Sequence, residues 1–515
     1  MTQPRDSNNN RNPTSPSLNE KIPREAWMSL AILGSALLIA MYGETMLLPA
    51  IPDIIQEFNI SYNTSSWILS AYLIAGAVAT PLGGKLSDIY GRKKMILIIM
   101  IVYIIGITLG GISTNITFLI VARVIQGIGI SMFPIAFGII RDQFPINKLA
   151  IGVGVFSSMF AAGSVVGLAL GANIIENFGW RTTFFSIVFV AIGLWFTIRR
   201  YIDDKQEAVS LADSSEQVHA PNQVENKLNV PNERHTNGKS RKKIDMKGTA
   251  TLTITIISLL MVLSYSQTNN IGYYQIAIFL VVGITSLVLF VIMEKKSKSP
   301  LVNFQLMANK IILSANIILV IAFLSMFTVF QTVPFLVRSP QPFGFGESVI
   351  TTANIQLPFM IVFLLFAPSS GFIVLKLGNV KPTVIGSIIS ALGFSSLFLF
   401  HSNGILVSTN LAIIAGGLSL MQVGGFDIIL QSTPRKFSGI SLGMTVLFNL
   451  VGGSVGPAIA GFYMQTNQVL TKNVGSYPSP ESYNLIFLTI ALASLIPIAL
   501  SIYIKNRCPY KIFVE

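Results

Sequence analysis

The chain has 515 residues, of which 52% are hydrophobic and only 11% carry a charge. Because a soluble protein of this length would be about a quarter charged, the composition excludes a large water-soluble enzyme and indicates a polytopic membrane protein. The formal net charge of +13 comes from Lys and Arg near the ends of apolar runs, so we expect no nucleic-acid binding. A single cysteine, Cys508, excludes an intramolecular disulfide, and three scattered histidines offer no metal site. We expect no cofactor.

The first 25 residues are polar and rich in Asn, Ser and Pro, with no apolar core or small-residue cleavage site. We therefore expect no cleaved signal peptide. The first apolar run is expected to remain in the membrane, behind a disordered cytoplasmic segment over residues 1–26.

Fourteen apolar runs are long enough to cross a bilayer, which takes about 20 residues. Six precede a polar gap, two follow it and six complete the chain. The predicted fold is an all-α membrane protein with 14 transmembrane helices in a 6+2+6 order. Its expected units are an N-terminal six-helix bundle (27–200), a flexible cytoplasmic linker (201–247), two inserted transmembrane helices (248–293), a C-terminal six-helix bundle (294–505) and a cytoplasmic tail (506–515).

The distribution of Lys and Arg gives this count an orientation. Basic residues gather at the N-terminus, in alternate loops such as 85–94, 141–148 and 376–381, and in the tail, whereas the intervening loops carry few. The positive-inside rule then places both termini in the cytoplasm. The polar linker mixes acids, bases, Asn, Ser and Gln, a composition that cannot bury a core. Its basic end (240–247) is expected to be a headgroup anchor or a regulatory docking site.

Two weak internal matches indicate that the first and last six spans are related halves. The sequence 84–94 (GKLSDIYGRKK) aligns with 371–381 (GFIVLKLGNVK), and 163–172 (GSVVGLALGA) aligns with 452–461 (GGSVGPAIAG). Leu375 and Asn379 stand where the first copy has Asp88 and Arg92. Repeats of this kind are typical of transporters that rock about a midplane site.

At these residues the chain resembles a known family. Residues 84–94 resemble the loop between the second and third helices of the major facilitator superfamily, and 123–129 (RVIQGIG) resemble its fourth-helix motif. Residues 67–81 (WILSAYLIAGAVATP), the pair Trp180-Arg181 and 300–310 (PLVNFQLMANK) resemble its fourteen-span drug:proton antiporter branch. The resemblance covers most of the chain and implies the superfamily fold.

The first-loop motif is predicted to act as a conformational latch. Gly84 and Gly91 allow a tight turn, and Asp88 and Arg92 are expected to hold one state closed on the cytoplasmic side. The alternative is a plain positive-inside turn, which we expect to be the role of Lys93 and neighbouring lysines.

Three charged residues within spans are candidates for proton coupling. Glu44 is expected to bind and release a proton, since burial favours the neutral form of a carboxyl group. Relatives of the fourteen-span branch usually carry an aspartate where this chain has Gly43, so Glu44 is displaced by one position, or roughly 100° around the helix. Arg123 is expected to interact with a nearby carboxylate or to reach the interface. Asp427 is predicted to form a helix-end ion pair with Arg435 or to face a cavity.

Glycines at four-residue spacing mark two further spans. Gly163, Gly167 and Gly171 resemble the fifth-helix antiporter motif, although Leu168 replaces the proline that drug exporters usually have; Gly456 and Pro457 retain the pair in the later copy. Such spacing also favours close helix packing in lipid without any transport role.

The substrate cavity is harder to read. Polar residues within spans should line the interior or pack against other helices, since they are costly in lipid. The expected cavity residues are Tyr72, Gln126, Gln331, Asn354, Gln356 and Gln422.

The sequence therefore predicts a proton-coupled antiporter that exports amphiphilic or cationic compounds, in a prokaryotic plasma membrane and as a monomer. The expected partners are a small-molecule substrate, protons and the lipid bilayer. An uptake or metabolite transporter of the same fold and a non-transporting membrane sensor are the alternatives.

Overall fold

The computed structural model of the chain describes residues 22–145, 149–202, 246–265, 273–297, 302, 304–434, 438–471 and 475–507. Most of the predicted linker and all of the predicted tail beyond residue 507 lie outside this part of the chain.

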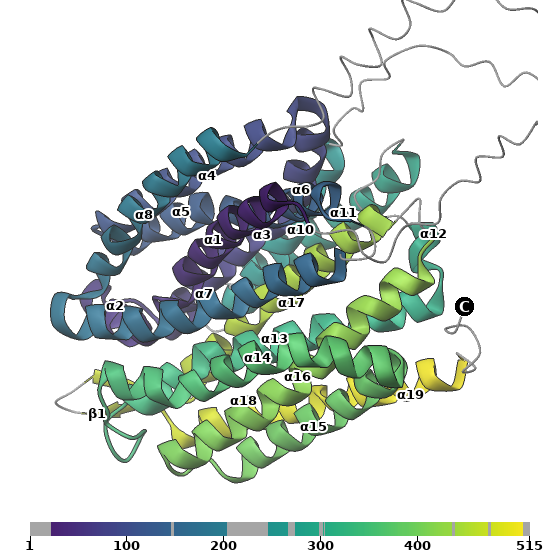
Figure 1. Ribbon diagram of the computed structural model, residues 1–515. Helices are drawn as coiled ribbons and strands as arrows, with labels where there is room; N and C mark the ends of the chain where they lie inside the picture. Colours follow the sequence, from purple (N-terminus) through teal and green to yellow (C-terminus); the bar gives the residue numbers. More distant parts are fainter. Residues whose placement is uncertain are drawn as a thin grey trace, which may run out of the picture.

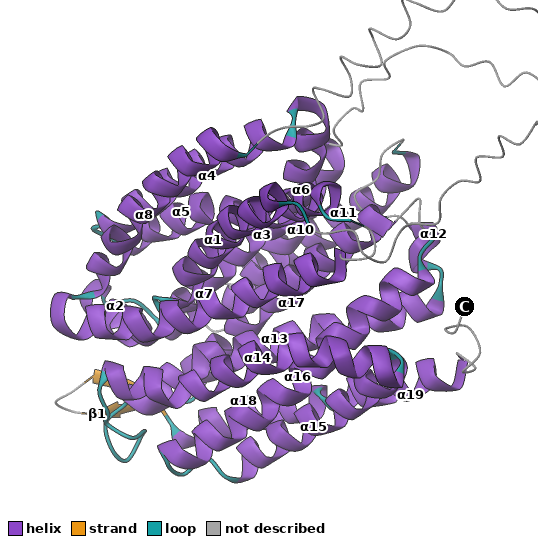
Figure 2. Ribbon diagram, viewed as in Figure 1, coloured by secondary structure: helices purple, strands orange, loops and turns teal. Residues whose placement is uncertain are grey.

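The described residues are almost entirely helical (Figure 2), with one short hairpin. The N half comprises helices α1 to α8, and the C half comprises α13 to α19; the pair α10 and α11 comes between them in sequence. The bounds of the N half are α1 (Arg24–Thr45), η1 (Leu48–Ala50), α2 (Ile51–Phe58), α3 (Tyr62–Tyr90), α4 (Arg92–Gly111), α5 (Ile116–Gly127), η2 (Ile128–Ser131), α6 (Met132–Gln143), α7 (Leu149–Phe178) and α8 (Trp180–Tyr201).

The remaining elements are mostly long helices. Their bounds are α10 (Met246–Tyr265), α11 (Tyr273–Lys296), α12 (Phe304–Met307), α13 (Lys310–Arg338), α14 (Val349–Leu377), α15 (Val380–Leu399), α16 (Gly404–Ser432), α17 (Ser438–Thr466), β1 (Gln468–Thr471), β2 (Gly475–Pro478), α18 (Pro480–Ala493) and α19 (Leu495–Arg507). The antiparallel β1–β2 hairpin pairs Gln468 with Pro478, and its end of the molecule lies opposite the C-terminus of α19 (Figure 1).

Thirteen helical segments among the described residues are long and apolar enough to cross a membrane, and Lys247–Val262 is a shorter apolar helix. Thirteen of the fourteen predicted runs correspond to these segments, and the remaining run, the first of the inserted pair, corresponds to the shorter helix. Several are not single straight helices. The first continues from α1 through η1 into α2, where Pro49 and Pro52 interrupt the backbone hydrogen bonding, and the fourth is divided into α5, η2 and α6.

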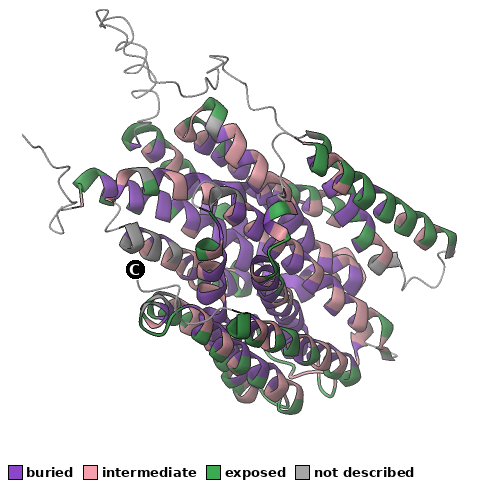
Figure 3. Cartoon of the chain, turned by 90° about the vertical axis from the view of Figure 1, so that its right-hand side faces the viewer, coloured by how far each residue is buried: buried purple, intermediate pink, exposed green. Residues whose placement is uncertain are grey.

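The two halves meet along two helix pairs, α3 with α17 and α7 with α14. The inserted helix α10 packs against both α3 and α17, while α11 packs on α10. Buried residues lie on the inward faces of the helices, and exposed residues lie on the outward faces (Figure 3). Many of the exposed residues are large and apolar, such as Phe189 and Ile405. This pattern fits a protein whose outer surface contacts lipid.

Glycines at corresponding positions confirm that the two aligned loops have the same backbone turn. Gly91 joins α3 to α4 with φ of 91°, and Gly378 joins α14 to α15 with φ of 77°. Other residues rarely adopt this left-handed region, so glycine is required at both turns. Gly84 differs, because a Cβ atom there would meet no atom within 4 Å.

The other repeated glycines bring helices into close contact within each half. A Cβ atom at Gly163 would lie 2.4 Å from the Leu38 carbonyl oxygen of α1, and one at Gly456 would lie 2.5 Å from the Leu324 carbonyl oxygen of α13. Cβ atoms at Gly167 and Gly171 would each lie 2.7 Å from a backbone carbonyl oxygen, that of Tyr42 in α1 and that of Met46 just after it, and Pro457 lies inside α17. The spacing therefore serves the same packing contact in both halves.

Candidate functional site: a cavity between the two halves

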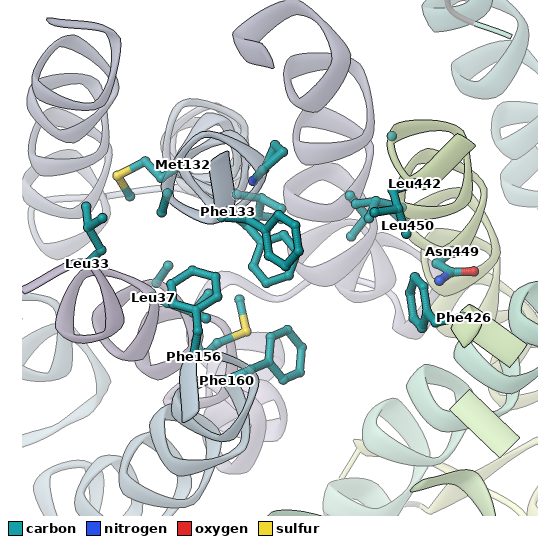
Figure 4. A pocket seen from close by; sticks show the side chains of 18 of the residues that line it. Leu33, Leu37, Met132, Phe133, Phe156, Phe160, Phe426, Leu442, Asn449 and Leu450 are labelled. Carbon is teal, nitrogen blue, oxygen red and sulfur yellow. The ribbon is translucent and has the colours of Figure 1, made fainter. Parts of the chain in front are cut away.

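A cavity of about 600 Å³ lies between the N half and the C half. Helices α1, α4, α6 and α7 line one side, and α13, α14, α16 and α17 line the other. Figure 4 shows Phe133, Phe156 and Phe160 gathered on the N-half side, facing Phe426, Leu442 and Leu450. The walls are mostly apolar and aromatic, as is usual for sites that bind small organic molecules.

Phenylalanine is the main wall residue. Three pairs have the spacing of one helical turn, and two further phenylalanines complete the set: Phe133 and Phe137, Phe156 and Phe160, Phe323 and Phe327, with Phe363 and Phe426. These phenylalanines were not among the cavity residues predicted from the sequence. Pairs of phenylalanines four residues apart within spans are the signal that would have indicated them, because such pairs share a helix face.

Charged residues lie at the two ends of the cavity. Glu44 lines its inner part and is only 7% exposed. Arg92, Arg141 and Asp427 line the other end, which we call the entrance; Arg141 is exposed there and Asp427 is half-buried. The cavity therefore opens at the entrance, the end of the bundle that the positive-inside rule predicts to face the cytoplasm.

The structure explains the displacement of the acid on α1. A Cβ atom at Gly43 would lie 2.4 Å from the Tyr103 hydroxyl and 2.6 Å from Gln126 Nε2, so a side chain at that position would have to displace both groups. The next residue, Glu44, lies on the cavity wall. The one-position shift thus leaves an acid facing the cavity.

Arg123 lies beneath this wall and is completely buried. Its Nη1 donates hydrogen bonds to the Gly43 carbonyl oxygen at 2.8 Å and to Gln126 Oε1 at 2.8 Å, and its Nε donates to the Ile68 carbonyl oxygen at 3.1 Å. The guanidinium stacks over the Tyr72 ring with 4.3 Å to the centroid. Arg123 therefore does not extend to the membrane interface.

Glu44 is the acid within electrostatic range of Arg123. One guanidinium nitrogen, Nη2, is buried without a hydrogen-bond partner among the described residues. A buried donor on a charged group is costly to leave unpaired. The site therefore offers a cation and a free donor to a deprotonated carboxylate.

Of the six predicted cavity residues, only Gln422 lines the cavity in this structure. Tyr72 and Gln126 instead surround Arg123, and Gln331 donates a hydrogen bond to Ser65 Oγ at 3.2 Å between the two halves. Gln356 is buried, and Asn354 is exposed. Residue polarity alone could not separate a cavity face from a helix–helix contact.

The predicted latch is only partly described. The guanidinium of Arg92 lies against α6, where a Cβ atom at Gly138 would be 3.0 Å from its Cζ. The side chain of Asp88 lies outside the described part of the chain, so its role stays a prediction. The predicted Asp427 partner Arg435 lies outside it too.

The end of the cavity opposite the entrance, which we call the closed end, is held by contacts between the halves. Asp53 of α2 forms an ion pair with Arg338 of α13. Glu176 Oε2 of α7 accepts a hydrogen bond from the Val349 backbone amide at the start of α14, at 3.2 Å. The sequence analysis missed these contacts because each partner lies more than 170 residues from the other.

A second layer of contacts lies beside them. The Tyr62 hydroxyl of α3 donates a hydrogen bond to the Ser476 carbonyl oxygen of β2 at 2.8 Å, and its ring packs edge-on against Phe335 of α13. The halves therefore touch at the closed end and stand apart at the entrance.

Comparison with known proteins gives the family context. The family described as Major Facilitator Superfamily matches residues 33–457. A multidrug transporter protein, MdtP, of Bacillus subtilis is 25% identical over 87% of this chain and 78% of its own length. Multidrug resistance protein 3 of Bacillus subtilis is 28% identical over 72% of this chain, which spans 61% of that relative. The tetracenomycin C resistance and export protein of Streptomyces glaucescens is 23% identical over 85% of this chain and 76% of its own length.

Solved structures show the same fold. The xylose transporter XylE from E. coli, in a partially occluded inward open conformation, superposes with a TM-score of 0.60 at 13% identity, covering 95% of this chain and 98% of that chain. A peptide transporter of the POT family superposes with a TM-score of 0.60 at 15% identity, covering 96% of this chain and 99% of that chain.

Proposed function

The chain belongs to the Major Facilitator Superfamily, and from this membership we propose that it is a proton-coupled antiporter of the fourteen-span drug:proton branch. It exports amphiphilic, cationic compounds by alternating access from the cell interior. The observation that supports this most directly is a cavity lined by phenylalanines, whose buried part contains one acid, Glu44, next to the buried cation Arg123. Relatives named as multidrug transporters and resistance proteins support the substrate class.

The cavity walls suit substrates that share little beyond size and apolar character. Aromatic rings and a cavity of about 600 Å³ can hold flat, hydrophobic molecules in more than one pose, since such contacts are not directional. A cationic group on the substrate is attracted by phenylalanine faces and by a deprotonated Glu44.

Exchange follows from competition at Glu44. A cationic substrate and a proton both neutralise the same carboxylate, and the low-polarity surroundings disfavour the charged, unoccupied form. Arg123 stabilises the deprotonated carboxylate between the two events. The cavity is therefore occupied by substrate or by a proton in turn, and each form favours reorientation of the halves.

The test is proton-driven efflux from vesicles loaded with a lipophilic cation such as tetraphenylphosphonium. Glu44→Gln is expected to abolish efflux driven by a pH gradient, while Glu44→Asp retains part of it. Glu347→Gln is the matched control, because Glu347 is an exposed acid outside the cavity lining. Efflux by Glu44→Gln at the rate of the unmodified protein would contradict the coupling role.

One observation favours a second candidate, transport of an anionic amphiphile or metabolite. Arg92 and Arg141 both line the entrance and outnumber Asp427 there. Gradient-driven movement of an organic anion, with no response to tetraphenylphosphonium, would support this function instead.

A further inference from the structure

The carboxylate of Asp427 is held in place by two amide side chains at the entrance. Gln431, one turn later on α16, donates a hydrogen bond from Nε2 to Asp427 Oδ2 at 2.6 Å. Asn379, at the start of α15, donates from Nδ2 to Gln431 Oε1 at 3.1 Å, so it is linked to the carboxylate through Gln431. Asn379 is only 3% exposed. The three side chains form one short network that fixes the direction of the carboxylate.

The network occupies the C-half counterpart of the first-loop motif. Asn379 follows Gly378 in the same way that Arg92 follows Gly91, and both glycines have the left-handed turn. In the N half this position carries a cation that lies along α6, and in the C half it carries an amide that is linked through Gln431 to an acid on α16. The two sides of the entrance therefore differ: the N-half turn supplies a cation, and the C-half turn supports a neighbouring acid.

Two arginines face this acid from the other half. Arg92 of α4 and Arg141 of α6 line the same cavity as Asp427. Among the described residues that line the entrance, two are cations and Asp427 is the acid, so an arriving cation competes with these arginines for it. An opposite charge carried by the other half of the same protein is the partner that this arrangement attracts.

We propose that Asp427 closes the entrance by pairing with Arg141 when the halves reorient, and that Asn379 and Gln431 are positioning residues for this contact. The inference rests on the alternating access proposed above. It makes the entrance the counterpart of the closed end, where Asp53 of the N half already pairs with Arg338 of the C half.

The test measures how often the closed end opens, since alternating access does not allow both ends to be open at once. Cys508→Ser removes the native thiol, and Ser65→Cys places a reporter at a position that is fully buried between the halves. Its reaction with a membrane-impermeant maleimide, without substrate or a pH gradient, reports the fraction of molecules with the entrance closed. Failure of proton coupling would therefore leave this measurement valid.

Loss of the entrance pair is expected to lower the labelling rate at residue 65. Asp427→Asn and Arg141→Gln should each lower it roughly two- to fivefold, the range of partly exposed ion pairs, and the double variant should match the single ones. Exchange of the two charges, Asp427→Arg with Arg141→Asp, should restore the rate. Asp53→Asn should raise it instead, because it weakens the closed end. Unchanged labelling in Asp427→Asn, or additive effects in the double variant, would overturn the proposal.

The positioning role has a separate readout. Asn379→Leu should lower the labelling rate at residue 65 when residue 427 is Asp. It should have no effect when residue 427 is already Asn, because Asn379 acts only by positioning the carboxylate. Gln431→Leu should do the same. An equal effect of Asn379→Leu in both backgrounds would mean that it acts through local packing, and would overturn its assignment.

Discussion

The two ends of the cavity carry opposite charges on opposite halves, yet only one end is shut. At the closed end, Asp53 and Arg338 are paired, and Glu176 caps the start of α14 across the same interface. At the entrance, Asp427 accepts a hydrogen bond from Gln431 of its own half, and Arg141 is exposed. The comparison teaches that the two ends differ in whether their opposite charges are paired across the halves. In the proposed transport cycle, these charged contacts determine which end is open.

The largest expected effect comes from reversing a charge at the closed end. Arg338→Glu places a third acid beside Asp53 and Glu176, so like charges now repel across the interface. We expect efflux to fall at least about tenfold, equivalent to about 1.4 kcal/mol, because the halves can no longer return to the described state. Efflux in vesicles measures the change.

Exchanging both charges provides the control for that variant. Asp53→Arg combined with Arg338→Glu should recover much of the lost efflux, since the pair is restored in reverse. If the double variant is as inactive as Arg338→Glu, the ion pair is not what holds this end.

An intermediate effect is expected within the N half, away from both ends. In Gly167→Ala the new methyl group would lie 2.4 Å from Thr45 Oγ1 and 2.7 Å from the Tyr42 carbonyl oxygen. Overpacking of this kind costs about 1–3 kcal/mol, so the thermal unfolding temperature in detergent should fall. Gly193→Ala is the matched control, because a Cβ atom there meets no atom within 4 Å and a helix interior favours alanine.

The two glycine variants separate an effect on folding from an effect on the two ends of the cavity. A close contact inside one half should affect the unfolding temperature without changing which end is open. A change in residue 65 labelling for Gly167→Ala, at unaltered unfolding temperature, would show that the contact belongs to the moving interface instead.

The smallest effect is expected from Tyr62→Phe. The variant keeps the ring against Phe335 and removes only the hydrogen bond to the Ser476 carbonyl oxygen. One such bond contributes about 1 kcal/mol, so labelling at residue 65 should rise roughly fivefold. Reduced labelling would mean that the hydroxyl does not help to hold the closed end.

The sequence predicted the spans and the repeat, because both depend on local patterns. Apolar runs mark helices that cross a bilayer, and glycines required for a left-handed turn recur at Gly91 and Gly378. It also identified Glu44, since a lone acid within a span is rare. The sequence could not show which way Glu44 faces, because the neighbours of Gly43, the Tyr103 hydroxyl and Gln126, come from other helices.

Other features could not be predicted because they depend on how distant segments meet. The Asp53–Arg338 pair joins residues 285 positions apart. Tyr72 and Gln126 look like cavity residues by polarity, but they surround Arg123 in the N half. The fourth span is divided at η2, next to a close approach of Gly127 to the Tyr72 backbone, and no local pattern indicates this contact between helices.

The most direct test of the account compares the two ends of one molecule as substrate binds. Reporter cysteines replace Ser65 at the closed end or Gly443 at the entrance, where a Cβ atom meets no atom within 4 Å, in the Cys508→Ser background. On addition of tetraphenylphosphonium, we predict faster maleimide labelling at residue 65 and slower labelling at residue 443, with neither change in Glu44→Gln. Slower labelling at 443 with an unchanged rate at 65 would contradict the account, because the cation would then bind without opening the closed end.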